Sequence, residues 1–467
     1  MSDDRPHVVV VGAYGSAGAA AASELAELDV RLTLVDDGDP GGGLCILRGC
    51  MPSKAVLSAT AHRYQARHDP RLDGEAPEVN LEKTVEHKDD HVLEWAGYRR
   101  ESVHDLTERE HVEFVHDRAE FLDEHTLRVG ERELDADYVV VATGSSLNVP
   151  DLPGIDDVDW MDSADVLDAT EFPDSGVVMG FGYVGIEMVP YLSEAAGMDL
   201  TVVEHDERPL DRADDRIGDE ILDLYREDFD VEIRTEVYEE SVEQTADGGV
   251  RLHLDDGSAV EADQLFLFTG RRPTVEGLGL ANAGIDVGEG WVDPATMQAR
   301  DAEHVFVAGD AMGERMLLHN SKEEAFTAAE NVRRAIAGES EFEEYYPIHH
   351  EVMFSGATVY PYASLGMTVE EAEEAGHDVV VATREATDDG IFKLKEARWG
   401  QAKLVVDADD GTVLGYHGLH YEADVMAKTM QVVLENEMDV RDVPDRAYHP
   451  TTPEIIDGLV RDAKAQL

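Results

Sequence analysis

The order of hydrophobic positions predicts a strand, a turn, a helix and a second strand within residues 7–36. His7 is followed by four valines, and a second apolar run ends at Asp36. Short runs of β-branched residues are typical of strands that are buried on both faces of a parallel sheet. The segment between them, from Gly15 to Glu27, is rich in alanine and has the length of a crossover helix. The pattern therefore predicts a βαβ unit.

Glycines mark the turn of this unit. Gly12, Gly15 and Gly18 have the spacing G-x-x-G-x-x-G, one residue longer than the usual dinucleotide-binding motif. Glycine at such a turn lets the backbone approach a pyrophosphate at the amino end of a helix. Asp36 ends the second strand, where an acidic side chain can accept a hydrogen bond from a ribose hydroxyl. An ordinary turn is the alternative interpretation, and the surrounding βαβ pattern favours nucleotide binding.

A second unit of the same kind begins at residue 176, and its glycines have the regular G-x-G-x-x-G spacing. Its strands, glycines and terminal acid are, in chain order, Val177–Met179, Gly180, Gly182, Gly185, Leu200–Val203 and Glu204. Two dinucleotide folds in one chain, with a cysteine pair after the first, imply an electron relay from a nicotinamide through a flavin to a disulfide.

Beyond residue 345 the pattern changes to alternating positions at 404–408 and 413–419 and an amphipathic helix near 421–437. These features predict a separate α+β domain. The fold class is therefore α/β, with two Rossmann-like domains and a C-terminal α+β domain. Clusters of Pro, Gly and charged residues divide the chain into four segments, 1–150, 151–275, 276–345 and 346–467.

The net charge is strongly negative. The chain has 38 Lys and Arg against 102 Asp and Glu, a formal charge of −64, so nucleic acid is not expected as a partner. The excess is typical of a halophilic protein, whose self-repulsion is screened only at high salt. A disordered acidic chain is excluded, because 43% of the residues are hydrophobic and they fall in strand-like and helix-like blocks.

The amino-terminal sequence has neither a basic leader nor a long apolar stretch, and no apolar run in the chain is long enough to span a bilayer. We therefore expect a cytoplasmic protein without a membrane partner.

The two cysteines of the chain, Cys45 and Cys50, lie close together. A long chain with no other thiol is not a disulfide-stapled secreted domain, so the pair points to redox chemistry. Residues five apart in a regular helix are too far apart for a disulfide, so bridging requires a distorted turn, which Gly49 and Pro52 make plausible. The alternative is a pair of buried, unbridged cysteines.

The chain resembles the pyridine nucleotide–disulfide oxidoreductase family, which includes dihydrolipoamide dehydrogenase, glutathione reductase and mercuric reductase. The resemblance spans nearly the whole chain, and its motifs occur in the family's order. They are Cys-x4-Cys-x-Pro-Ser-Lys at 45–54, Ala142-Thr143-Gly144, residues 180–187, Thr269-Gly270-Arg271, Ala308-Gly309-Asp310 and residues 449–454.

The resemblance implies roles for individual residues. Cys45 would be the thiol that attacks the substrate, and Cys50 the thiol nearest the flavin. We expect a neighbouring cation and a helix amino end to lower the pKa of the attacking thiol. His449, oriented by Glu454, would protonate the leaving thiolate from the other subunit of a homodimer formed by the last domain. Lys54 and Glu187 would form an ion pair beside the flavin.

The same resemblance assigns the cofactors. Segments 1–150 and 276–345 would bind FAD, residues 151–275 would bind NAD(P), and residues 346–467 would form the dimer. The expected FAD-binding residues are Gly12, Gly15, Ser16, Gly18, Asp36, Thr143, Gly144 and Asp310. The expected NAD(P)-binding residues are Gly180, Gly182, Tyr183, Gly185, Glu204 and Gly270. No metal site is expected.

Departures from the family patterns narrow the substrate. Leu47 and Arg48 replace the usual loop of dihydrolipoamide dehydrogenases, and no further cysteine pair lies near the carboxyl end as in mercuric reductases. Ser23 and Glu24 stand where glutathione reductases place arginines. We therefore expect a bis-γ-glutamylcystine reductase that maintains reduced thiol. The alternatives are a dihydrolipoamide dehydrogenase of a 2-oxoacid dehydrogenase complex and, in another class, a flavin diaphorase or a non-catalytic scaffold.

The nicotinamide coenzyme is NADPH or NADH, and two arguments conflict. Glu204 would repel a 2′-phosphate and favours NADH, whereas His205, Arg208 and Arg212 could bind that phosphate. Small-thiol reductases of this family usually use NADPH, which tips the sequence-based expectation slightly toward NADPH.

Overall fold

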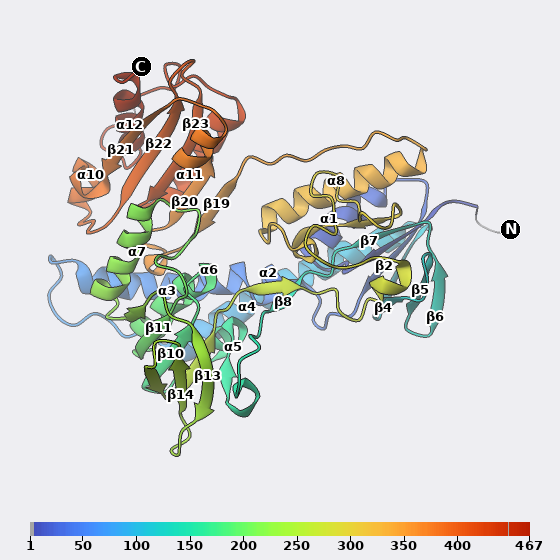
Figure 1. The fold of residues 1–467 in the computed structure, drawn as a ribbon, viewed down its shortest axis with the longest axis horizontal. Helices are drawn as coiled ribbons and strands as arrows, with labels where there is room; N and C mark the ends of the chain where they lie inside the picture. Colours follow the sequence, from blue (N-terminus) through green and yellow to red (C-terminus); the bar gives the residue numbers. More distant parts are fainter. Residues whose placement is uncertain (1–3, 447) are drawn as a thin grey trace. The chain divides into compact units, whose positions relative to one another are not determined.

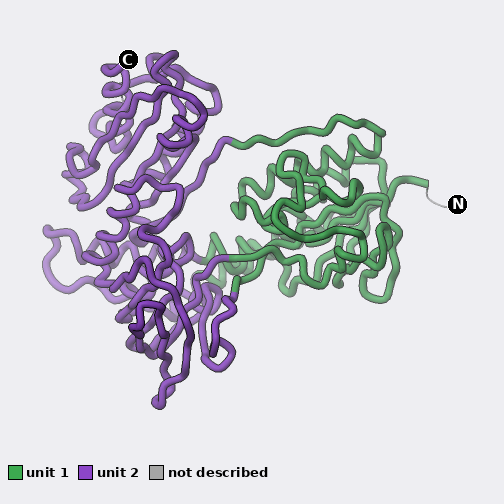
Figure 2. The backbone as a smooth tube through the Cα atoms, in the orientation of Figure 1, with its two compact units in different colours: residues 1–52, 88–148, 271–347 green, residues 53–87, 149–270, 348–467 purple. Residues whose placement is uncertain are grey.

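A computed structural model describes residues 4–446 and 448–467. The chain divides into two compact units (Figure 2), one of residues 1–52, 88–148 and 271–347 and the other of residues 53–87, 149–270 and 348–467. The first three residues of the amino-terminal segment, inspected above for a targeting signal, lie outside the described residues. Among the helices described, none has both the length and the apolar character needed to cross a membrane.

The first unit is built on a parallel sheet with the strand order β18-β7-β1-β2-β3 (Figure 1). All five residues of the central strand β1 are buried, which explains its uninterrupted valines. The alanine-rich helix α1 packs against α8 beside this sheet. These elements are β1 (His7–Val11), α1 (Ser16–Leu25), β2 (Arg31–Asp36), β3 (Val112–His116), β7 (Tyr138–Val141), β18 (Val305–Val307) and α8 (Leu318–Ile336).

Smaller elements complete the first unit. An antiparallel sheet consists of β4 (Ala119–Phe121), β5 (Thr126–Val129) and β6 (Arg132–Asp135), and a two-stranded ribbon pairs β8 (Ser145–Leu147) with β17 (Arg271–Pro273). The short helix α2 (Leu44–Leu47) precedes α3 (Cys50–His68), and α4 (Leu81–Asp105) follows. The division between the two units falls within α3 and α4.

The second unit contains another parallel sheet, in the order β12-β11-β10-β16-β9. Its elements are β9 (Trp160–Met161), α5 (Ser163–Asp168), β10 (Ser175–Met179), α6 (Tyr183–Pro190), β11 (Asp199–Val203), α7 (Asp215–Asp228), β12 (Glu232–Arg234) and β16 (Gln264–Leu267). An antiparallel sheet of β13 (Glu239–Gln244), β14 (Val250–Leu254) and β15 (Ala259–Ala262) accompanies it. Both βαβ units expected from the sequence are therefore present.

The same unit ends in an antiparallel sheet ordered β19-β20-β23-β22-β21, with α11 against β20 and β23 and α12 against β21 and β22 (Figure 1). Its elements are β19 (His350–Met353), β20 (Tyr362–Gly366), α9 (Val369–Glu374), β21 (Val379–Glu385), α10 (Gly390–Leu394), β22 (Gln401–Asp407), β23 (Val413–Leu419), α11 (Ala423–Glu435) and α12 (Glu454–Lys464). The predicted α+β character of this segment is confirmed.

Candidate active site

The two cysteines lie on either side of a helix break. Cys45 is the second residue of α2, and Cys50 is the first residue of α3. Between them the backbone leaves the helical conformation at Arg48, with φ −142° and ψ 11°. A continuous helix would hold residues five apart beyond disulfide reach. The break therefore supplies the distortion that the sequence argument required.

In this structure Cys45 and Cys50 are both thiols. A side-chain hydrogen bond to Cys50, together with burial, raises the pKa of Cys45, while the nearby guanidinium of Arg99 acts in the opposite direction. The sequence had led us to expect a lowered pKa. The difference arises because the hydrogen bond to Cys50 stabilises the protonated form of Cys45, and a stabilised protonated form raises the pKa.

Arg99 was not identified from the sequence. It lies on α4, far along the chain from the cysteines, and its Nη1 donates to the carbonyl oxygen of Tyr14 at 3.2 Å. Burial lowers the pKa of Arg99, and its interaction with Cys45 opposes that effect. No local motif marks this arginine, because only the packing of α4 brings it beside the thiol.

Arg48 lies between the two cysteines and is exposed. Within the described part of the chain, its guanidinium makes neither a hydrogen bond nor an ion pair. The net charge of the chain is −64, and most of its other arginines form ion pairs with carboxylates, such as Arg132 with Glu113 and Arg208 with Asp219. Arg48 is therefore a cation that remains available to an anionic group of a substrate.

The first glycine-rich turn lies at the carboxyl ends of β1 and β7, the point where the strand order of the sheet reverses. A Cβ on Gly12 would lie 2.3 Å from the carbonyl oxygen of Ala142, so only glycine fits there. Gly15 caps α1, and Ser16 begins that helix. Open α/β sheets bind nucleotides at the carboxyl ends of the strands where the strand order reverses.

Two further residues at this end of the sheet follow the neighbouring strand β7. The hydroxyl oxygen of Thr143 is buried and has no hydrogen-bond partner, as expected for a group that meets a ligand. A Cβ on the next residue, Gly144, would meet no atom within 4 Å. Gly12, Thr143 and Gly144 thus follow the strands β1 and β7 at one end of the sheet, and the Thr143 hydroxyl is a buried polar group without a partner there.

Asp36 and Asp310 both lie at this end of the sheet. The carboxylate of Asp36 accepts the backbone N–H groups of Tyr14 and Gly38, each at 2.8 Å. Burial raises the pKa of Asp36. Asp310 accepts a hydrogen bond at 2.5 Å from Ser145 Oγ. Each aspartate is fixed by neighbouring groups and retains oxygen lone pairs for hydroxyl donors.

The second glycine-rich turn repeats the first. A Cβ on Gly180 would lie 2.6 Å from the carbonyl oxygen of Phe268, which follows the neighbouring strand β16. Gly182 and Gly270 have open space around them, and Gly185 packs on the turn itself. Glu204 accepts the backbone N–H of Phe181 at 2.7 Å, as Asp36 accepts that of Tyr14.

Lys54 and Glu187 form a close ion pair, with Nζ 2.6 Å from Oε2 and 2.7 Å from Oε1. The ammonium group also lies 4.4 Å from the centre of the Phe354 ring. Tyr183, at the start of α6, donates its hydroxyl to Glu351. The structure therefore brings Lys54 and Glu187 together as the sequence predicted.

His449 and Glu454 also form a pair. His449 Nδ1 lies 3.1 Å from both carboxylate oxygens of Glu454, and the histidine side chain is 79% exposed. Hydrogen bonds from the backbone N–H of Thr451 and from His449 lower the pKa of Glu454. Because a carboxylate accepts, Nδ1 carries a proton and Nε2 is left to exchange protons with another group.

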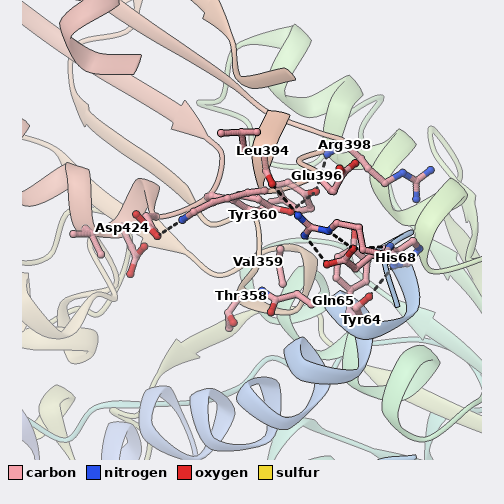
Figure 3. Close-up of a pocket in the computed structure, with 16 residues that line it drawn as sticks. Tyr64, Gln65, His68, Thr358, Val359, Tyr360, Leu394, Glu396, Arg398 and Asp424 are labelled. Carbon is pink, nitrogen blue, oxygen red and sulfur yellow. Dashed lines mark hydrogen bonds and ion pairs between the residues drawn. The ribbon is translucent and has the colours of Figure 1, made fainter. Parts of the chain in front are cut away.

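A separate cavity of about 550 Å³ lies in the second unit (Figure 3). Tyr360 and Arg398 line it, and Tyr360 stacks on Tyr421 with ring centroids 4.9 Å apart. Its lining includes neither cysteine nor His449. The cavity is therefore distinct from the residues assigned to the redox reaction.

Comparison with known protein families gives two matches. Residues 6–325 match the family described as pyridine nucleotide-disulphide oxidoreductase. Residues 354–459 match the dimerisation domain of the same family. The two matches cover both parallel sheets and, apart from β19, the C-terminal sheet.

Individual relatives agree with these matches. Dihydrolipoyl dehydrogenase 2 of Haloarcula marismortui is 30% identical, covering 98% of this chain and 97% of its own length. A mercuric reductase of Bacillus cereus is 28% identical over 88% of this chain and 63% of its own. Among solved structures, the flavoprotein disulfide reductase RclA of Escherichia coli superposes with a TM-score of 0.81 at 24% identity, covering 98% and 99% of the two chains.

Proposed function

The chain belongs to the pyridine nucleotide-disulphide oxidoreductase family, and we propose that it is an NADH-dependent reductase of bis-γ-glutamylcystine. Family membership makes it an oxidoreductase that uses FAD and a pyridine nucleotide and acts on sulfur groups. When bound, FAD passes electrons from the nicotinamide to the cysteine pair. The substrate, the choice of NADH and the roles of individual residues are our proposals.

In the proposed reaction, the reduced cysteine pair performs two exchanges. The partner subunit's His449 takes the proton of the Cys45 thiol on Nε2, and the resulting thiolate attacks one sulfur of the substrate, so that a mixed disulfide forms and the substrate disulfide breaks. His449 Nε2, in the partner subunit of a homodimer, gives a proton to the departing thiolate. Cys50 then attacks Cys45, which releases the second thiol and closes the Cys45–Cys50 disulfide.

Arg48 is the observation that favours this substrate. Bis-γ-glutamylcystine carries four carboxylates around its disulfide, whereas lipoamide has none near its ring. A cation without a protein partner, placed between the two redox cysteines, suits the first molecule and gives no advantage to the second. The proposed substrate also lacks the glycine whose carboxylate glutathione reductases bind.

Dihydrolipoyl dehydrogenase activity is the second candidate. It is favoured by the relatives from Haloarcula marismortui and Halobacterium salinarum, each 30% identical to this chain over nearly its full length. Under this alternative the enzyme would serve a 2-oxoacid dehydrogenase complex, and Arg48 would be neutral variation.

The proposal for NADH rests on ion pairs of the cations that follow Glu204 in the chain, and it revises the slight preference for NADPH drawn from the sequence. Each cation that could have bound a 2′-phosphate has a carboxylate partner. The pairs are His205 with Glu239 at 2.6 Å, Arg208 with Asp219 at 2.7 Å and Arg212 with Glu371 at 2.5 Å. Glu204 then remains to accept from a ribose 2′-hydroxyl.

The first test compares the reduction of bis-γ-glutamylcystine and lipoamide by the holoenzyme under anaerobic conditions in molar KCl. We expect a higher kcat/KM for the γ-glutamyl disulfide. Cys45→Ser should abolish reduction of both disulfides and leave dye reduction largely intact, since a dye takes electrons without the thiols. Unchanged disulfide turnover in Cys45→Ser would refute the thiol mechanism.

Arg48→Gln tests the substrate assignment. We expect the KM for bis-γ-glutamylcystine to rise about tenfold, because one charge-assisted contact with the substrate is lost. The KM for lipoamide should change little. Arg251→Gln, which removes an arginine from β14, is the matched control for the change in net charge and should leave both values unaltered. A faster reaction with lipoamide that is insensitive to Arg48 would favour the dihydrolipoyl dehydrogenase instead.

The coenzyme assignment is tested with NADH and NADPH at saturating disulfide. We expect kcat/KM to be at least about tenfold higher for NADH. Repulsion between the Glu204 carboxylate and the 2′-phosphate of NADPH should weaken binding by more than ~1.4 kcal/mol, the free energy that corresponds to a tenfold ratio. Glu204→Ser should reduce this ratio. A preference for NADPH in the wild-type enzyme would reject the assignment.

A further inference from the structure

Three side chains with metal-ligating groups meet in the first unit, apart from every residue assigned above. Glu124 and His125 lie in the turn between β4 and β5, and His304 immediately precedes β18. One ligand atom from each lies within 4.8 Å of the others. The parallel and antiparallel sheets of this unit thus bring together residues from distant parts of the chain.

Hydrogen bonds fix which nitrogen of each histidine is available. His125 Nδ1 lies 3.0 Å from the carbonyl oxygen of Ala136, and His304 Nε2 lies 2.5 Å from that of Glu124. A carbonyl oxygen only accepts, so these two nitrogens carry the protons. The lone pairs of the neutral rings are therefore on His125 Nε2 and His304 Nδ1. Metal-bound histidines characteristically hold their other N–H in this way.

The surroundings favour oriented rings. His304 is 8% exposed, so its ring is held by the surrounding residues. The two imidazole rings lie with centroids 4.2 Å apart. Asp123 accepts the backbone N–H groups of His125 and Thr126 at 3.1 and 2.9 Å, which fixes the turn that carries the other two ligands.

We propose that Glu124, His125 and His304 bind one divalent transition-metal ion of the zinc type. Two imidazoles and one carboxylate are a ligand set that zinc accepts, with a water molecule in the fourth position, whereas Mg²⁺ and Ca²⁺ prefer oxygen ligands alone. Zinc at ~2.1 Å from each ligand needs the donor atoms closer together than 4.8 Å. Asp123 holds the backbone of the turn, and the exposed side chains of Glu124 and His125 can rotate toward the buried His304.

Binding would join the β4–β5 turn to the edge strand β18. The ion would bridge two segments that are otherwise connected here by the hydrogen bond between His304 and the Glu124 carbonyl. The expected role is therefore structural, and it does not depend on the disulfide substrate or the coenzyme.

Zinc binding to the holoenzyme is the direct test, measured by equilibrium dialysis with the Cys45–Cys50 pair oxidised so that the thiols do not compete. We expect one zinc ion per chain. His125→Gln and Glu124→Gln should each weaken binding by at least about tenfold. Added zinc should raise the Tm of the wild-type protein and not that of His125→Gln.

His253→Gln is the matched control, because His253 forms a surface pair with Glu243 at 3.3 Å but has no second histidine. It should bind zinc as the wild-type protein does. The proposal is overturned if the oxidised wild-type protein binds no zinc, if His125→Gln binds it with unchanged affinity, or if His253→Gln weakens binding equally. The same variants should leave disulfide reduction unchanged, which keeps this test separate from that of the proposed function.

Discussion

Glu324 is a buried carboxyl group at the end of the first sheet. Its Oε2 accepts the backbone N–H of Gly309 at 2.9 Å, and its Oε1 is buried without a hydrogen-bond partner. Burial raises the pKa of Glu324 from 4.5 to about 7. The neighbouring residue Asp310 adds to this effect, and Arg315 opposes it. At the residue scale, this carboxyl group makes folding sensitive to pH.

The sign of that sensitivity follows from proton uptake. Between pH 4.5 and about 7 the folded state holds a proton on Glu324 that the unfolded chain has lost. The stabilising effect is therefore complete below pH 4.5 and is lost as the pH rises to about 7. We predict that Glu324→Gln flattens the dependence of the unfolding free energy on pH in this window. At pH 8 the variant should be more stable than the wild type by up to ~3 kcal/mol.

Denaturant unfolding of the holoenzyme across this pH range measures the effect. Glu289→Gln, on an exposed loop, is the control and should follow the wild type. Parallel pH profiles for Glu324→Gln and the wild type would show that Glu324 does not titrate in this range.

At the scale of elements, Asp228 connects three parts of the second unit. It is the last residue of α7, and its side chain is fully buried. Its carboxylate accepts from the hydroxyl of Tyr64 on α3, from the guanidinium of Arg398 and, at 2.8 Å, from Trp399 Nε1. The last two residues lead into β22, so one buried carboxylate joins α3, α7 and the C-terminal sheet.

We predict that Asp228→Ala destabilises the protein by about 3–5 kcal/mol, because the substitution leaves Arg398 without its counter-charge and two further donors without an acceptor. Asp223→Ala removes an exposed aspartate from the same helix and should change stability by less than ~0.5 kcal/mol. Thermal and denaturant unfolding of both variants check this. Equal effects of the two substitutions would contradict the assigned role of Asp228.

At the scale of the whole molecule, the net charge of −64 opposes the compact state. Many arginines form exposed ion pairs, such as Arg132 with Glu113 and Arg251 with Glu261. Pairs of this kind contribute only ~0–1 kcal/mol each and leave most of the carboxylates uncompensated. Screening by salt is therefore needed to reduce the repulsion.

We predict that the protein unfolds or loses activity when KCl is lowered from 1 M to 0.1 M, since the screening length increases from ~3 Å to ~10 Å. Circular dichroism and activity measured over this range test the prediction. Potassium sulfate at equal ionic strength should protect at least as well as KCl. Full stability at 0.1 M would show that carboxylate repulsion is not what limits folding.

Local sequence was sufficient for several parts of the site. The valine run of β1 and the glycines after β1 and β10 predicted both dinucleotide-binding units, because burial on two faces and close backbone approach each demand particular residues. The pairing of Lys54 with Glu187 and of His449 with Glu454 was expected from the resemblance to the family, and the structure contains both pairs. The direction in which the pKa of Cys45 shifts was not predicted correctly, because it depends on the hydrogen bond to Cys50 and on Arg99, which lies far along the chain.

The sequence by itself determined the two βαβ units with their glycine-rich turns, the α+β character of the C-terminal segment, the cysteine pair and the charge of the molecule, because each depends on neighbouring residues or on composition. Only the tertiary structure decided which cations have carboxylate partners, as with Arg212 and Glu371, and which side chains meet, as with His125 and His304. Such contacts join segments far apart in the chain, and packing of the sheets and helices, which no local pattern encodes, brings them together.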